Sequence, residues 1–220
     1  MATGIAILFH TIGLIGFLFI PSSTFTATTP LNLVLMCALL FYTQPQKNKA
    51  FYIFFAVCFV VGIAVEIIGT STGLLFGNYS YGTVLGPGIM NVPFIIGVNW
   101  FIIMYCCGVT VHYLLQYLSR SLAAKTGKPS RTIKALSVVV DGATLAVFFD
   151  WLMEPVAVRL GYWTWMGNGD IPVLNYICWF VISVLLLLVF QQLRFNRQNK
   201  FAVNLLLIQA MFFLLLRTFL

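Results

Sequence analysis

The chain has 220 residues, of which 61% are hydrophobic and only 8% are charged, and its mean hydropathy is +0.99. This composition excludes a soluble globular domain, in which about 25% of residues are charged. It predicts a single integral membrane domain over residues 1–220. The net charge of +7 fits the excess of Lys and Arg in the cytoplasmic loops of membrane proteins, so we expect no nucleic-acid partner.

Seven apolar stretches are long enough to cross a bilayer, since a hydrocarbon core of about 30 Å needs about 20 residues of helix. In chain order, they are residues 4–20, 24–43, 50–76, 93–118, 132–153, 172–193 and 201–219. No Lys or Arg precedes the first stretch, so we expect it to be a retained helix rather than a signal peptide. The sequence therefore predicts an all-α, multi-pass bundle of about seven transmembrane helices.

Basic residues are concentrated in alternate loops. The loops after the second, fourth and sixth spans contain or adjoin ten of the 12 Lys and Arg residues, whereas the loops after the first, third and fifth contain only Arg159. Because Lys and Arg favour cytoplasmic loops, residues 77–92 and 154–171 are predicted to lie outside the cytoplasm. We predict the amino terminus outside and the carboxyl terminus, with Arg217, inside.

Several classes of membrane protein are excluded by residues that are missing. Retinal proteins bind their chromophore through a lysine of the last helix, and residues 201–219 contain none. Di-iron desaturases need several histidine clusters, but only His10 and His112 are present. The five cysteines form no Cys-x-x-Cys pair, and phosphate-binding and serine-hydrolase motifs are absent. We therefore expect no cofactor and no metal.

Glu66 is an acidic residue inside the third predicted span, where a carboxylate is costly and usually functional. It lies about 24 Å along that helix from the cytoplasmic end. Gly62, Gly69 and Gly73 share its helical face. This stripe of small residues predicts close helix packing, with Glu66 pointing into the bundle.

The fifth span and its end contain three more acidic residues. Asp150 and Glu154 are four residues apart and share one face, with Asp150 about 27 Å from the cytoplasmic end. Asp141 faces the other way, and we expect it to serve helix packing. Glu66, Asp150 and Glu154 are therefore predicted catalytic residues at one depth. The structural alternative is that Glu66 is a hydrogen-bonded helix clamp and Glu154, before Pro155, marks a helix end.

Two loops rich in glycine and aromatic residues follow these acids. Any single ring is best explained by the aromatic belt of a membrane interface. Together with three acids on the same side, the two clusters favour a lined pocket that binds substrate. The candidate binding rings are Tyr79, Tyr81, Trp163 and Trp165. Asn91 and Asn175, and also Asn99, lie at the start of the next spans and are candidates to bind water.

Two motif blocks surround these residues. The first reads Glu66-x-x-Gly69-x-x-x-Gly73-x-x-Phe76-Gly77-x-Tyr79-x-Tyr81-Gly82-x-x-Leu85-Gly86-Pro87, followed by Pro93 and Trp100. The second reads Asp150-x-x-x-Glu154-Pro155, then Gly161-Tyr162-Trp163-x-Trp165, then Ile171-Pro172-x-x-Asn175 and Trp179. Over about residues 60–180, this pattern resembles the membrane carotenoid hydratase family. The family commonly has Asp-Pro where this chain has Glu154-Pro155, which keeps the carboxyl group but lengthens its reach.

The resemblance implies a cofactor-independent hydro-lyase, an enzyme that adds water to the terminal C-1,2 double bond of an acyclic carotenoid end group. Family substrates include γ-carotene, lycopene and a bacterioruberin precursor. The implied location is the cytoplasmic membrane of a prokaryote. The implied partners are the carotenoid, water and the lipid bilayer, and contact with other enzymes of the carotenoid pathway is left open.

Hydration of such an alkene starts with protonation at C-2, which gives a tertiary cation at C-1 that water then captures. A buried carboxyl group tends to keep its proton. We predict that Asp150 is the proton donor and that Glu66 is the base that orients water. The faces of the four aromatic rings would stabilise the cation.

Three alternatives remain open: a carotene cyclase, a proton-coupled transporter and a purely structural subunit. A carotene cyclase would start from the same protonation, but an internal double bond would capture the cation, so the product would have unchanged mass. A proton-coupled transporter would use the acids as a relay. The transporter is disfavoured because the acids cluster near one face and no inverted repeat is evident.

Overall fold

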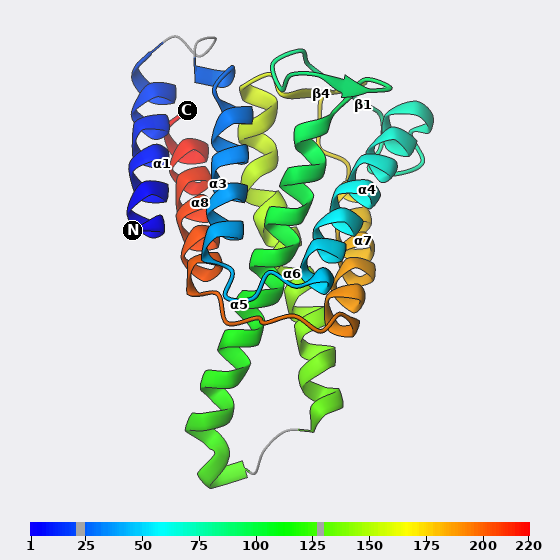
Figure 1. Cartoon of the computed structure of the whole chain (residues 1–220). Helices are drawn as coiled ribbons and strands as arrows, with labels where there is room; N and C mark the ends of the chain where they lie inside the picture. The colour runs from blue at the N-terminus through cyan, green and yellow to red at the C-terminus, as the bar shows by residue number, and fades with distance from the viewer. Residues whose placement is uncertain (21–24, 127–129) are drawn as a thin grey trace.

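The computed structural model describes residues 1–20, 25–126 and 130–220, except for the side chains of residues 120–126. Within these residues it is a bundle of seven helices with two short sheets (Figure 1). The helices are α1 (Ala2–Phe19), α3 (Thr29–Thr43), α4 (Lys49–Thr72), α5 (Phe94–Thr126), α6 (Arg131–Arg159), α7 (Val173–Gln192) and α8 (Lys200–Phe219). The predicted all-α, multi-pass class is confirmed.

Among the described helices, six are long and apolar enough to cross a membrane, and α3, with 15 residues, is shorter. The second predicted span, 24–43, begins too early: residue 24 is outside the described residues, and α3 starts only at Thr29. Pro30 lies in the first turn of α3, where its missing N–H costs no intrahelical hydrogen bond. The helix therefore begins where proline is tolerated.

Helix α6 runs past Pro155 and ends at Arg159, six residues beyond the predicted span, so Glu154 does not mark a helix end. Proline has no N–H and leaves the carbonyl four residues earlier, that of Trp151, without its helical donor. Arg217 of α8 donates to this carbonyl oxygen at 2.6 Å. Its guanidinium also lies 3.8 Å from the centroid of the Trp151 ring. An arginine from another helix thus compensates for the proline.

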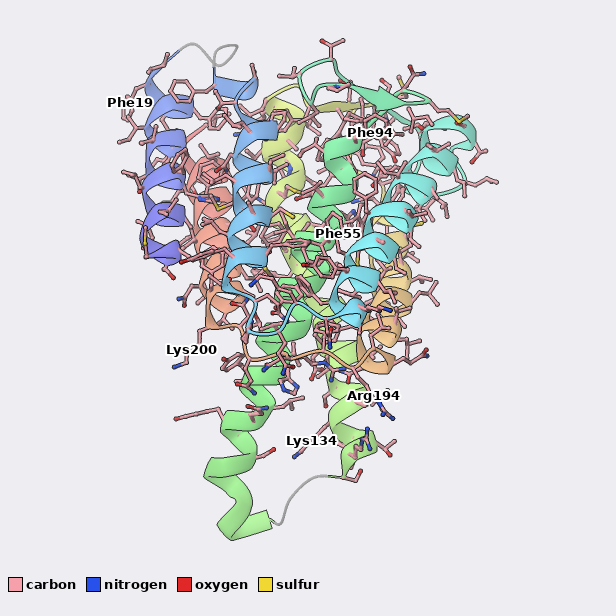
Figure 2. All side chains as sticks on the ribbon, viewed as in Figure 1. Phe19, Phe55, Phe94, Lys134, Arg194 and Lys200 are labelled. Carbon is pink, nitrogen blue, oxygen red and sulfur yellow. The ribbon has the colours of Figure 1, made fainter. Side chains whose placement is uncertain are left out.

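Helices α1, α3 and α4 to α8 alternate in direction, so the loops at residues 44–48 and 193–199 lie at one end of the bundle and the short sheets at the other (Figure 1). Gln44 Nε2 donates to the carbonyl oxygen of Asn196 at 2.7 Å, which ties the two loops together. Lys134, Arg194 and Lys200 lie toward this end of the bundle (Figure 2). We call it the basic end.

The structure places the amino terminus at the same end of the bundle as the basic loops and the carboxyl terminus at the opposite end, whereas we predicted the reverse. Asn204, early in α8, donates to Thr3 Oγ1 at 3.1 Å, so α1 starts toward the basic end, while Arg217 places the end of α8 toward the sheets. An odd number of alternating helices puts the two termini at opposite ends, and the first helix starts on the side of the basic loops. The predicted outer amino terminus and inner carboxyl terminus are therefore inconsistent with cytoplasmic basic loops. One predicted basic loop residue, Lys128, is outside the described residues.

Two short antiparallel sheets close the other end. Strand β1 (Tyr79–Tyr81) pairs with β4 (Trp163–Trp165), and β2 (Gly88–Ile89) pairs with β3 (Val92–Pro93). The first sheet joins two loops that are far apart in the sequence. Because residues 79 and 165 face each other across it, the two aromatic clusters become one layer.

Candidate active site

Glu66 is a buried carboxyl group on α4 that accepts three hydrogen bonds. Trp100 Nε1 donates to Glu66 Oε1 at 3.0 Å. The hydroxyl of Tyr81 donates to Glu66 Oε2 at 2.7 Å, and the hydroxyl of Tyr79 donates to the same oxygen. These donors come from α5 and β1, so Glu66 joins three elements that are separate in the sequence.

Glycines on α4 make room for the rings that bind Glu66. A Cβ added to Gly62 would lie 2.6 Å from the Trp100 ring, and one added to Gly69 would lie 2.9 Å from the Tyr79 hydroxyl oxygen. Gly73 ends the helix with a φ of +68°, a left-handed conformation that favours glycine. The small-residue stripe thus admits two aromatic side chains.

Strands β1 and β4 place four aromatic rings on the face of their sheet that points to the acids. Side chains alternate along a strand, so Tyr79 and Tyr81 share one face while Ser80, between them, is exposed. On β4, the Nε1 atoms of Trp163 and Trp165 donate to Glu154 Oε2 at 3.0 and 3.1 Å. One strand therefore binds Glu66 and its neighbour binds Glu154.

Asp150 is the third carboxyl group and is fully buried on α6. Asn175 Nδ2 of α7 donates to Asp150 Oδ2 at 2.8 Å. The other oxygen, Oδ1, is buried and has no hydrogen-bond partner among the described residues. Asp150 therefore has a fully buried carboxyl oxygen that no donor among the described residues reaches.

The three carboxyl groups line one cavity of about 30 Å³, which we call the acid cavity. Its lining is Glu66, Phe76, Tyr79, Tyr81, Ile96, Asn99, Trp100, Asp150, Met153, Glu154, Trp163, Trp165, Asn175 and Trp179. Among the described residues this lining contains no Lys, Arg or His, so nothing basic balances the acids there. A polar cavity of this size has room for about one water molecule.

The two tyrosines remain hydrogen-bond donors at neutral pH. Burial, together with the nearby charge of Glu66, raises the pKa of both Tyr79 and Tyr81 above the ordinary value of a phenol. Both hydroxyl groups therefore keep the protons that they donate to Glu66.

Eight of the nine predicted site residues line the acid cavity, and Asn91 does not. Asn91 is exposed in the two-residue turn between β2 and β3. There Met90 and Asn91 have φ of 49° and 64°, as a hairpin turn with two left-handed residues requires. Asn91 therefore has a role in the turn, and it does not bind water in the acid cavity. Asp141, expected to pack between helices, is instead exposed on α6, with no hydrogen bond among the described residues.

Six residues that line the cavity are not among the nine predicted site residues: Phe76, Ile96, Asn99, Trp100, Met153 and Trp179. The Trp100 and Trp179 rings stack at a centroid distance of 4.1 Å and an angle of 14°. Both residues belong to the two motif blocks. The sequence therefore indicates that they matter to the family, but it does not show that they line the cavity. Asn99, one residue before Trp100, is the residue that the sequence indicates only as a further candidate to bind water, and it lines the cavity.

No group of three or more His, Cys, Asp or Glu side chains in the described part of the chain is arranged to hold a metal ion. His10 Nδ1 hydrogen-bonds to the carbonyl oxygen of Ala6 at 2.8 Å, and His112 Nε2 to Gln116 at 2.8 Å. All five cysteines are buried and unpaired. None of these histidines and cysteines lines the acid cavity.

A larger cavity of about 640 Å³ lies at the basic end. Its lining includes His112, Arg131, Lys134, Arg194 and Arg197, with no carboxyl group among the described residues. Without an acid it cannot supply the carboxyl chemistry of the small cavity, although it is much larger.

The chain is similar to known proteins of carotenoid biosynthesis. The family model described as "Carotenoid biosynthesis protein" matches residues 27–220. Bisanhydrobacterioruberin hydratase from Haloarcula japonica is 27% identical over 129 residues, which cover 57% of this chain and 40% of that protein. The match thus spans less than half of the relative's length. No solved structure matches the chain.

Proposed function

Since the chain belongs to the carotenoid biosynthesis protein family, we propose that it is a hydratase that adds water to the terminal C-1,2 double bond of an acyclic carotenoid end group. The name of the Haloarcula relative supports hydration. The family and the apolar helices make the chain a multi-pass membrane protein of carotenoid biosynthesis. We propose the cytoplasmic membrane as its location.

The observation that carries this proposal is the enclosure of three carboxyl groups, with no basic side chain among the lining residues, in one water-sized cavity. Three enclosed negative charges would repel one another strongly. At least one group is therefore expected to carry a proton, as an acid catalyst must.

The hydrogen bonds support Asp150 as this acid. Glu66 accepts three hydrogen bonds and Glu154 accepts two, and such donors stabilise a negative charge. Asp150 accepts one, and its Oδ1 is free. A proton on Oδ1 could pass to C-2 of the substrate, where the π electrons of the C-1,2 bond form the new C–H bond and leave a cation at C-1.

Glu66 is then the base. The water oxygen bonds to C-1 while one of its protons passes to Glu66, so the product gains one hydrogen at C-2 and one hydroxyl at C-1. After this step Asp150 is ionised and Glu66 is protonated. Glu154 lies one helical turn from Asp150 and lines the same cavity, and we propose that the proton returns to Asp150 through it.

Aromatic faces around the cavity stabilise the cation without trapping it, because they attract positive charge but form no bond with it. Trp163 and Trp165 line the cavity, and the N–H groups of both donate to Glu154, which fixes the two rings beside it. The stacked Trp100 and Trp179 line another part of it.

The test is conversion of lycopene or γ-carotene in a bacterial host that accumulates it, with pigments analysed by chromatography and mass spectrometry. We expect a product that is heavier by one water and has nearly unchanged visible absorption, since the terminal double bond is outside the conjugated system. Asp150→Asn and Glu66→Gln should each lower conversion about 100-fold or more.

Asp141→Asn is the matched control, because it removes a carboxyl group from the same helix outside the cavity, and it should convert pigment at the unchanged rate. Full activity of both Asp150→Asn and Glu66→Gln would refute the mechanism. An isomeric product of unchanged mass with a shorter chromophore would instead establish a cyclase.

A further inference from the structure

A third cavity, mostly apolar and of about 280 Å³, adjoins the acid cavity. Residues of α1, α3, α5, α6 and α8 line it, and we call it the apolar cavity. Four residues line both cavities: Ile96, Asn99, Met153 and Trp163. The three carboxyl groups thus lie directly beyond one wall of a space suited to hydrocarbon.

The apolar cavity reaches the lipid-facing surface between α1 and α3. Phe9 and Ile12 of α1 and Leu31 of α3 line it, yet they are 43%, 49% and 70% exposed. Helices α1 and α3 lie toward one edge of the bundle, and α8 is seen between them (Figure 1). On the surface of a membrane-spanning bundle, an opening between apolar side chains faces lipid, where a carotenoid is dissolved.

We propose that the apolar cavity binds one acyclic isoprenoid end group, which enters sideways from the bilayer between α1 and α3, while the rest of the carotenoid stays in lipid. This inference rests on the proposed function, because it supplies the substrate to that site. In this arrangement the carboxyl groups and water lie in the acid cavity, and the hydrocarbon end of the substrate lies in the adjoining apolar cavity.

The volume supports an end group rather than a whole carotenoid. At about 30 Å³ for each heavy atom, the share of one molecule in liquid water, the cavity holds on the order of ten heavy atoms. That is about two isoprene units of a carotenoid that has forty carbons. The enzyme should therefore recognise the acyclic end that enters and be insensitive to the far end.

Asn99 lies at the junction and has the chemistry to bind water there. Its side chain lines both cavities and has no hydrogen bond with any part of the chain that the structure describes. A primary amide offers both donors and an acceptor. Trp163 borders the same junction, so a cation formed at the entering end would meet its ring.

The binding test fills the apolar cavity. In Gly13→Leu, the new Cβ would lie 3.5 Å from the Phe212 ring, an ordinary contact, and the rest of the side chain would occupy the cavity. Gly4→Leu is the matched control, because Gly4 is on the same helix, lines none of the cavities described above and has nothing within 4 Å of an added Cβ.

Both substitutions are made in the Asp150→Asn background, so that bound pigment is not converted, and lycopene retained per purified protein is measured by absorbance. We expect Gly13→Leu to retain at least about tenfold less lycopene than Gly4→Leu. Equal retention in the two would overturn the inference. If Gly13→Leu fails to fold, as judged by size-exclusion chromatography, Leu31→Trp at the opening replaces it with the same two outcomes.

The second arm compares substrates in the protein with its natural residues. Lycopene and γ-carotene, which differ at the far end, should be hydrated at rates within a few-fold of each other, and more than tenfold discrimination would refute end-group recognition. Retention of lycopene without any hydrated product would refute the proposed function and leave the binding site standing. Equal hydration rates in Gly13→Leu and Gly4→Leu would refute the binding site and leave the proposed function standing.

Discussion

At the scale of single residues, the three acids differ in how many donors reach them. Glu66 accepts from two phenols and an indole, Glu154 from two indoles, and Asp150 from one amide. Their burial alone would make them equivalent, because all three are almost inaccessible to solvent. It is the donor count that separates an acid from a base in our proposal.

Trp100→Phe tests the importance of the donors to Glu66. The substitution removes the Nε1–H that donates to Glu66 at 3.0 Å but keeps an aromatic ring against Trp179. A hydrogen bond to a charged group contributes about 1.5–3 kcal/mol, so the hydration rate should fall about tenfold or more. Pigment conversion per amount of protein measures this.

Trp179→Phe is its control, since the Trp179 ring stacks in the same pair and lines the same cavity but donates to no carboxyl group among the described residues. It should lose less activity. Equal losses in the two variants would show that stacking, and not the bond to Glu66, is what matters.

At the scale of elements, the site depends on an unusually close approach of aromatic side chains to α4 and on a two-strand pairing. Gly62 allows the Trp100 ring to lie against the α4 backbone. Pairing of β1 with β4 then brings the donors of Glu66 and Glu154 side by side. Neither strand could form alone, because a short strand needs a partner for its backbone groups.

Gly62→Ala should therefore disturb the site from outside the cavity. Its Cβ would lie 2.6 Å from the Trp100 ring, so the ring must move, at a cost of about 1–3 kcal/mol. We expect a lower midpoint of thermal unfolding in detergent and a lower hydration rate. Gly4→Ala, with open space around the added atom, should keep the unfolding midpoint and the hydration rate unchanged. If Gly62→Ala also leaves both unchanged, the close contact between the α4 backbone and the Trp100 ring is not important to the site.

At the scale of the whole molecule, the bundle separates a basic end from an end that contains the acids. The loops at residues 44–48 and 193–199 contain basic residues and are joined by the hydrogen bond from Gln44 to Asn196. Lys and Arg favour the cytoplasmic side. With the termini as the structure places them, we therefore predict that the amino terminus is cytoplasmic and that the acid cavity and the carboxyl terminus lie near the opposite face.

Reporter fusions test this orientation. Alkaline phosphatase fused after Leu220 should be active, because it folds only outside the cytoplasm. Green fluorescent protein fused after Gln198 should fluoresce, because we expect that loop to be cytoplasmic. The reverse pattern at both positions would mean that the basic end faces outward. The two fusions control each other, since α8 alone separates them.

The sequence by itself determined the membrane class, the approximate helices and the acids on α4 and α6 as candidates. These follow from hydropathy and helical periodicity, which are properties of neighbouring residues. Local reasoning failed at Pro155, because Arg217 from a distant helix supplies the donor that keeps α6 continuous. It failed at Asn91 because a turn and a water site both favour asparagine.

Only the tertiary structure decided which donors bind which acid, since Trp100, Tyr81 and Glu66 come together from three elements. It also showed that the acid cavity adjoins an apolar one through Asn99 and Trp163. Cavities and hydrogen bonds between distant residues depend on how helices pack, and no pattern along one helix encodes the side chains that another will present.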